Sequence, residues 1–125
     1  MNHLVDSCGW LEFFMVGPNA SLFEPAIRDR ERLIVPTVCL SEVFKILYRR
    51  EGRTTALGYV MSMQKGTVVD LDRSIALEAG MISVDHKLPL ADSIILATAM
   101  AYDARVWTQD AHLKIFREVK FVGKN

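Results

Sequence analysis

Hydrophobic and polar positions along the chain follow two alternating patterns, short apolar runs and longer helical stretches. The short runs are bounded by turn or cap residues and predict buried strands at His3–Asp6, Leu33–Val35, Thr67–Asp70, Arg105–Thr108 and about Val119–Val122. Between them, helices are predicted from about Ser7 to Val16, about Ala20 to Arg30, Thr37 to about Glu51, Thr54 or Thr55 to about Gln64, Asp72 to about Asp85, and onward from Pro89. Because parallel strands need crossover helices, this alternation predicts a three-layer α/β/α sandwich with a central, mainly parallel sheet.

Length and composition limit the kinds of protein this can be. At 125 residues, half of them hydrophobic, the chain is expected to form a single domain over residues 1–125. Lys plus Arg and Asp plus Glu number 15 each, so the net charge gives no overall attraction to a polyanion. The uncharged apolar window at residues 93–102 is far shorter than the roughly 20 residues that span a bilayer. Cys8 and Cys39 lack metal-ligand spacing and are interpreted as reduced core thiols, which indicates a cytoplasmic protein. No signal peptide is expected, because residues 1–3 contain no Lys or Arg and acids interrupt the apolar stretch that follows.

Four carboxylates occupy positions where a folded chain ordinarily has apolar or small residues. Asp6 and Asp110 each close a predicted buried strand, and such strand ends line the ligand crevice of an open parallel sheet. Glu42 lies on an apolar helix face, and Asp92 is the charged residue of a helix that is apolar on nearly every side. An isolated buried carboxylate costs several kcal/mol, so these acids are expected to be neutralised, paired or bound to a cation. If they converge, their oxygen atoms suit Mg²⁺ or Mn²⁺, and such a centre can cleave phosphodiesters.

Each acid also has a structural interpretation. Asp92 could be a first-turn acid favoured by the helix dipole, and the two strand-end acids could be turn residues. Glu42 could pair with Lys45 or with Arg49 on the same helix face. The remaining acids are expected to have other roles: Asp72 as a cap, Asp70, Asp85 and Asp103 at element ends or turns, and Glu12, Glu24, Glu31, Glu51, Glu78 and Glu118 in solvent.

Four segments, taken in order, resemble a known family. They are Leu4-Val5-Asp6-Ser7, Leu40-Ser41-Glu42-Val43, the segment from Leu88 to Ala99 that begins Leu88-Pro89-Leu90-Ala91-Asp92, and Thr108-Gln109-Asp110. Together they resemble the motifs of the PIN-domain ribonucleases, specifically the VapC-type toxins of bacterial and archaeal type II toxin–antitoxin (VapBC) pairs. The resemblance covers the whole chain.

The resemblance implies a metal-dependent endoribonuclease, the toxin component of a toxin–antitoxin pair. Its catalytic and metal-binding residues would be Asp6, Glu42, Asp92 and Asp110, which would hold one or two Mg²⁺ or Mn²⁺ ions. Such ions can activate a water, orient the scissile phosphate and stabilise the leaving oxygen.

The resemblance also implies roles for two hydroxyl groups and for partners. Ser7 and Thr108 match positions where a small hydroxyl can orient a carboxylate or a metal-bound water; Ser7 could equally cap the first helix. The expected partners are an RNA substrate, a cognate antitoxin whose tail brings a basic side chain toward the acids, and a second copy in a homodimer. The aromatic residues Trp10, Phe13, Phe14 and Phe23 are expected largely in the core, although some could line the groove for the antitoxin.

Basic side chains offer a local path for RNA despite the neutral net charge. Lys45 and Arg49, on the helix of Glu42, are the RNA-binding candidates; basic residues near a helix C-terminus can also simply complement its dipole. The chain departs from the family pattern at His112, where many relatives have a further acid, and at Cys8, where a small polar residue is common.

Two other functions compete with this interpretation. A phosphoacceptor receiver domain also places acids at strand ends, but it predicts a paired acid after the first strand, an acceptor Asp after the third and a Lys after the fifth. This chain instead places two acids within apolar helices. A catalytically silent PIN fold that binds RNA or protein is the closer alternative.

Overall fold

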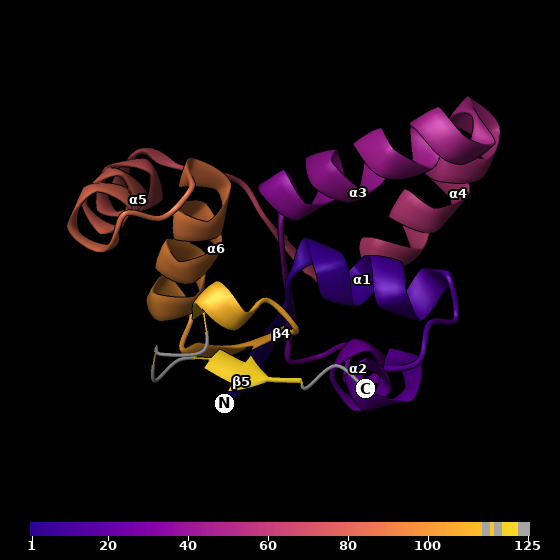
Figure 1. Ribbon diagram of the computed structural model, residues 1–125, viewed down its shortest axis with the longest axis horizontal. Coiled ribbons are helices and arrows are strands. Elements are labelled where there is room, and N and C mark those ends of the chain that lie inside the picture. The colour runs from indigo at the N-terminus through magenta and orange to yellow at the C-terminus, as the bar shows by residue number, and fades with distance from the viewer. Residues whose placement is uncertain (114–115, 117–118, 123–125) are drawn as a thin grey trace.

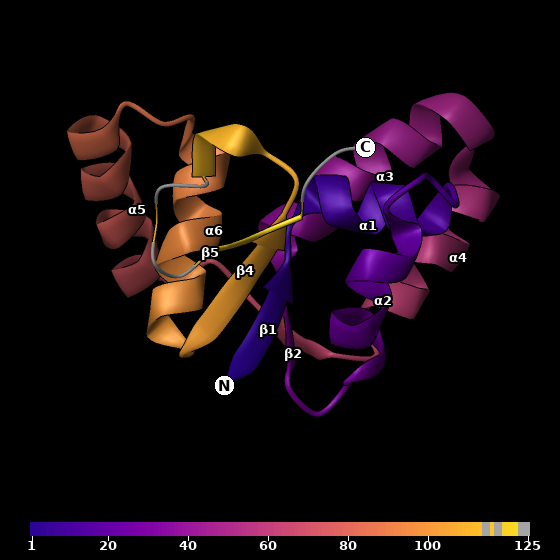
Figure 2. The same ribbon diagram turned by 60° about the horizontal axis from the view of Figure 1, so that its bottom comes forward.

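The computed structural model describes residues 1–113, 116 and 119–122, except for the side chain of His112. Within these residues one sheet has the strand order β3-β2-β1-β4-β5, and every neighbouring pair runs parallel. Figure 1 shows the whole chain, and Figure 2 labels β1, β2, β4 and β5. The strands are β1 (Asn2–Val5), β2 (Leu33–Pro36), β3 (Thr67–Val69), β4 (Ala104–Thr108) and β5 (Val119–Phe121).

Helices cover both faces of the sheet. They are α1 (Ser7–Phe14), α2 (Ala20–Arg28), α3 (Thr37–Glu51), α4 (Arg53–Met63), α5 (Arg73–His86) and α6 (Leu90–Ala101), with a short 3₁₀ helix η1 (Ala111–Leu113) after β4. In Figure 2, α5 and α6 lie on one side of β1 and β4, and α1 and α2 lie on the other. The predicted three-layer α/β/α sandwich is confirmed. No helix in the described part of the chain has both the length and the apolar character needed to cross a bilayer.

The strand order creates a switch point between β1 and β4. The chain builds outward from β1 to β2 and β3, then crosses back to place β4 on the other side of β1. In open parallel sheets, the crevice that binds ligands lies beyond the carboxyl ends of the strands at such a point. Receiver-like folds instead have the order 2-1-3-4-5, so the receiver alternative is wrong.

Side-chain caps begin two of the helices, α1 at Asp6 and α5 at Asp72. Asp72 accepts a hydrogen bond from the Ile75 backbone N–H at 2.8 Å, which confirms its predicted role as the cap of α5. The predicted Thr54 or Thr55 cap of α4 is wrong. Gly52, with φ +85°, ends α3 and immediately precedes α4, because glycine adopts a left-handed backbone that a threonine would resist.

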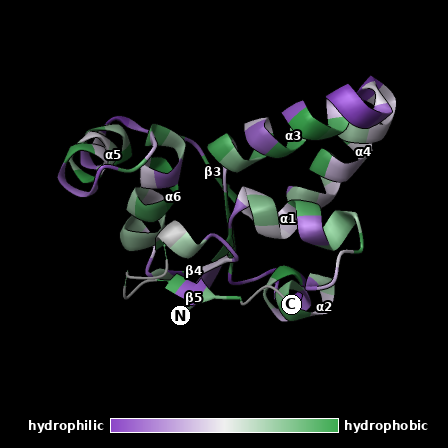
Figure 3. Cartoon of the chain, in the orientation of Figure 1, coloured by the Kyte–Doolittle hydropathy of each residue, from purple (hydrophilic) through white to green (hydrophobic). Residues whose placement is uncertain are grey.

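The core fills the space between the sheet and its helices. Leu4, Val5 and Val106 on the central strands are fully buried, and α6 is mostly apolar, in keeping with its burial (Figure 3). Trp10 and Phe23 are also buried in this core, as the sequence predicted.

Gly9 allows α1 to approach the sheet closely. A Cβ atom there would lie 2.7 Å from atoms of Phe23 and of Val5. We therefore expect Gly9→Ala to lower the free energy of unfolding by about 1–3 kcal/mol, since these buried neighbours would have to move. Gly80→Ala is the matched control in a helix, where an added Cβ meets nothing within 4 Å, and it is expected to stabilise by up to about 1 kcal/mol. Denaturant unfolding of both variants measures the contrast, and a Gly9→Ala protein as stable as wild type would contradict it.

Candidate functional site

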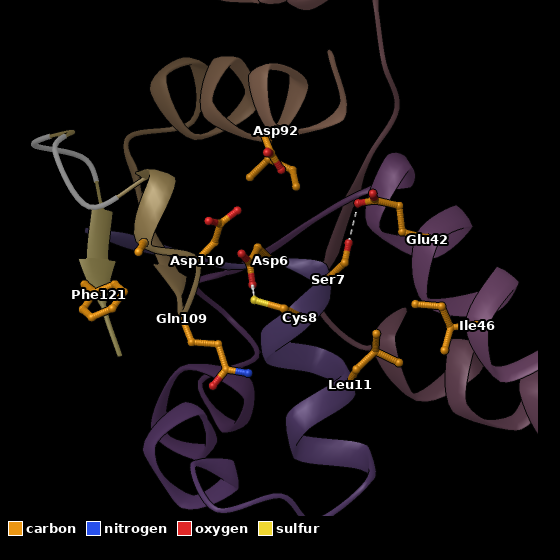
Figure 4. Close-up of a pocket in the computed structure, with 12 residues that line it drawn as sticks. Asp6, Ser7, Cys8, Leu11, Glu42, Ile46, Asp92, Gln109, Asp110 and Phe121 are labelled. Atoms are coloured by element: carbon orange, nitrogen blue, oxygen red, sulfur yellow. Dashed lines mark hydrogen bonds between the residues drawn. The ribbon is translucent and has the colours of Figure 1, made fainter. Parts of the chain in front are cut away.

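A cavity of about 760 Å³ opens beyond the carboxyl ends of β1 and β4. The four acids singled out in the sequence, Asp6, Glu42, Asp92 and Asp110, all line it (Figure 4). They come from four separate segments: the turn after β1, the middle of α3, the first turn of α6 and the turn after β4. The fold therefore brings together side chains that are up to about a hundred residues apart.

Asp6 is the most buried of these acids, with 5% of its surface exposed. One carboxylate oxygen, Oδ1, accepts hydrogen bonds from the Gly9 backbone N–H at 3.0 Å and from the Cys8 thiol at 2.9 Å. The other oxygen, Oδ2, accepts a hydrogen bond from the Thr108 hydroxyl. Asp6 is also the N-cap of α1, which the Gly9 contact completes. Both oxygens are thus fixed in direction by neighbours on two different elements.

Burial raises the pKa of Asp6 above its ordinary value of 3.8, because the charged form has lost contact with water. The hydrogen bonds to its carboxylate act in the opposite direction, and the negative charge of Asp110 adds to the increase. Two carboxylates near one another in a partly enclosed cavity favour a cation between them.

Thr108 connects the two strand-end acids. Its hydroxyl is fully buried, donates to Asp6 and accepts the Asp110 backbone N–H at 2.9 Å. One hydroxyl therefore orients the carboxylate of Asp6 and holds the start of the turn that presents Asp110.

Ser7 has a comparable role for Glu42. Its hydroxyl donates to Glu42 Oε1 at 2.6 Å, across from α1 to α3 (Figure 4). The N-cap of α1 is Asp6, so the alternative role of Ser7 as the helix cap is wrong. Glu42 forms no ion pair with Lys45 or Arg49, which are likewise described; both cations are exposed, and neither lines the cavity.

The side chains that line the cavity have the oxygen atoms that a divalent cation prefers, but these atoms are not spaced to hold one ion. Oxygen donors dominate the cavity, and none of its described lining residues is Lys, Arg or His. Among the described residues, however, no three acidic, His or Cys side chains stand close enough together to hold one ion as they are. The carboxylates would need to rotate toward one another to complete a metal site.

Two polar side chains, those of Cys8 and Gln109, line the cavity but were not recognised from the sequence as part of it. Cys8 was expected in the core but is only partly buried, and burial raises the pKa of its thiol to about 12, so the thiol stays protonated near neutral pH. Cys39 is the fully buried thiol, and neither cysteine forms a disulfide. Gln109 also lines the cavity, and its position between Thr108 and Asp110 was the available signal. The side chain of His112 lies outside the described residues.

A second hollow, of about 510 Å³, lies between α1 and α4. Phe13, Phe14 and Tyr59 line it, with the Phe14 and Tyr59 ring centroids 4.7 Å apart. Gly58 also lines this hollow, and a Cβ atom added there would meet nothing within 4 Å. The aromatic residues of α1 thus divide, as the sequence suggested, between the core and a groove.

Known proteins share this fold, and a family model matches the sequence. Solved structures that share the fold include a toxin–antitoxin complex from Klebsiella pneumoniae, with a TM-score of 0.79, 18% identity and coverage of 95% of this chain and 96% of that chain. They also include VapBC2 from Rickettsia felis bound to a promoter DNA fragment, with a TM-score of 0.75, 10% identity and coverage of 98% of each chain. No curated protein has significant sequence similarity to this chain. The model of the PIN domain family matches residues 3–122, nearly the whole sequence. The chain therefore belongs to the PIN domain family, as its motifs predicted.

Proposed function

We propose that this protein is a metal-dependent endoribonuclease and the toxin of a toxin–antitoxin pair, built as a single nuclease domain. One observation carries the proposal: four carboxylates from four separate segments of a PIN-family chain line a single cavity at the switch point of the sheet. In this proposal Asp6, Glu42, Asp92 and Asp110 hold Mg²⁺ or Mn²⁺.

The residues around the acids would prepare them for this task. When bound, one or two divalent ions would supply an activated water and neutralise charge on the scissile phosphate. Thr108 and the Gly9 backbone hold the Asp6 carboxylate in one orientation, and Ser7 does the same for Glu42. Such outer contacts raise the precision of a metal site, because they reduce the number of side-chain arrangements that must be ordered on binding.

RNA would approach along α3 in this proposal. Lys45 and Arg49 are exposed on the helix that carries Glu42, although neither lines the cavity. Exposed cations of this kind attract the phosphate backbone without reading sequence, and each phosphate contact makes binding more dependent on salt.

The proposed protein partners are an antitoxin and a second copy of the chain. Both solved structures described above are toxin–antitoxin assemblies, which supports an antitoxin partner, and the groove of Phe13, Phe14 and Tyr59 offers an apolar aromatic surface for one of its helices. On α5, Leu77, Met81 and Val84 are exposed, an apolar surface that supports a homodimer. The reduced cysteines suit the cytoplasm, where RNA substrates occur.

Cleavage of RNA by the purified protein tests the proposal. We expect products with Mg²⁺ or Mn²⁺ and none with EDTA, because the acids would otherwise lack the cation that makes them active. Asp92→Asn should lose this cleavage, and Asp70→Asn, the same substitution at an exposed acid outside the cavity, should retain it.

Two outcomes would contradict the proposal. Cleavage that survives EDTA would mean that the acids act without a metal. A folded protein that binds RNA or an antitoxin but cuts no RNA with either ion would favour the catalytically silent PIN module instead.

A further inference from the structure

Gln109 lies beside the four acids in the lining of the cavity. It follows β4 directly, between Thr108 and Asp110. In the view of Figure 4 it extends from Asp110 on the side away from Asp92. Its side chain is half-buried, so it is both held by the protein and open to the cavity.

A buried asparagine holds the amide of Gln109. Asn19 Nδ2 donates to Gln109 Oε1 at 3.1 Å, and Asn19 is only 2% exposed. Asn19 occupies the N-cap position of α2 but makes no capping bond with its side chain, the usual role of asparagine there. Its amide instead reaches a residue 90 positions away in the sequence.

A further contact fixes Asn19 itself. The Asn19 backbone N–H donates to Glu12 Oε2 at 2.9 Å, which anchors the turn before α2 to α1. Glu12 was expected in solvent, and this half-buried contact corrects that prediction. The three residues form a connected path from α1 to the cavity, so the orientation of the Gln109 amide is determined by the fold.

This arrangement leaves the donor end of Gln109 available. Oε1 is engaged by Asn19, whereas Nε2 has no hydrogen-bond partner among the described residues. Of the other polar side chains that line the cavity, Ser7 donates to Glu42 and Cys8 donates to Asp6. The acids are acceptors when ionised. Gln109 is therefore the described lining side chain with hydrogen-bond donors not already committed.

We propose that Gln109 is a substrate-contact residue whose Nε2 donates a hydrogen bond to an acceptor atom of the RNA beside the scissile phosphate, with Asn19 as its positioning residue. This inference rests on the proposed ribonuclease function. RNA presents such acceptors on its phosphates, its ribose hydroxyls and its base edges. A neutral donor can bind any of them without adding a charge to a cavity built around carboxylates and a cation.

Steady-state cleavage by Gln109→Met tests this inference. Methionine preserves the length of the side chain and removes its donors, so we expect KM to rise about tenfold while kcat stays within about twofold. Gln64→Met is the matched control, because Gln64 is exposed at the end of α4 outside the cavity, and its KM should not change. Asn19→Ser should give a smaller rise in KM, since the amide of Gln109 would remain but lose its support.

The cut sites in a mixed RNA pool identify the acceptor. Loss of preference for one nucleotide beside the cut would assign the contact to a base edge, and uniform weakening would assign it to phosphate or ribose. If Gln109→Met fails to fold, Gln109→Glu replaces it, because the carboxylate still accepts from Asn19 but repels an RNA acceptor, and a larger rise in KM is expected.

The results separate this inference from the proposed function. Wild-type protein that cleaves no RNA overturns both. Wild-type cleavage combined with an unchanged KM and unchanged cut sites in folded Gln109 variants overturns this inference alone. A fall in melting temperature without a change in KM would show that the contact between Asn19 and Gln109 only joins α2 to β4.

Discussion

Replacing Asp6 by asparagine is expected to lower metal-dependent RNA cleavage by about a thousandfold or more, equivalent to ~4 kcal/mol of transition-state stabilisation. The charge of Asp6 would be lost at the centre of the proposed site. The side-chain carbonyl of asparagine can still accept the Gly9 backbone N–H and cap α1, so the backbone there should keep its course. Single-turnover cleavage with Mn²⁺ measures the loss directly.

The same substitution is expected to leave the metal-free protein at least as stable as wild type at pH 7. Burial raises the pKa of Asp6, which means that the ionised form is held in the fold at a cost. A neutral amide removes that cost. Asp70→Asn is the control for both measurements, since Asp70 is exposed. Cleavage by Asp6→Asn near the wild-type rate would remove Asp6 from the site, and an unfolded variant would show that its charge supports the fold.

Adding Mn²⁺ is expected to stabilise the wild-type protein strongly at pH 7 and weakly at pH 5. At a concentration of about 100 times Kd, binding to the folded state alone would raise the free energy of unfolding by about 2.7 kcal/mol. Because carboxylates must lose their protons to bind a cation, this increment should shrink as the pH falls. Thermal unfolding with and without MnCl₂ across this range measures it.

Without metal, the contribution of Asp6 has the opposite dependence on pH. Its raised pKa means that the folded state binds the proton more tightly than the unfolded state. The resulting stabilisation is fully present below the unfolded value near 3.8 and is lost as the pH rises through the folded-state pKa. The difference in stability between wild type and Asp6→Asn isolates this contribution from those of other acids.

Equal melting temperatures with and without Mn²⁺ at pH 7 would contradict the proposed metal site.

Local sequence patterns predict which elements form and which side chains are candidates for metal chemistry. Apolar runs and cap residues are local signals, and they located the strands, the helices and the cap at Asp72 to within a few residues. The four acids stood out because burying an ionised group in an apolar stretch costs free energy unless the group is paired or bound to a cation. Their presence around one cavity agrees with that interpretation.

The contacts among these side chains depend on how distant segments of the chain pack in three dimensions. Thr108 reaches Asp6 across 102 positions, and Asn19 reaches Gln109 across 90, so neither contact leaves a trace in local periodicity. The contact by which Ser7 holds Glu42 likewise depends on the packing of α1 beside α3. The strand order has the same origin, because it reflects which buried surfaces pack best together, and that free energy is shared among residues far apart in the chain.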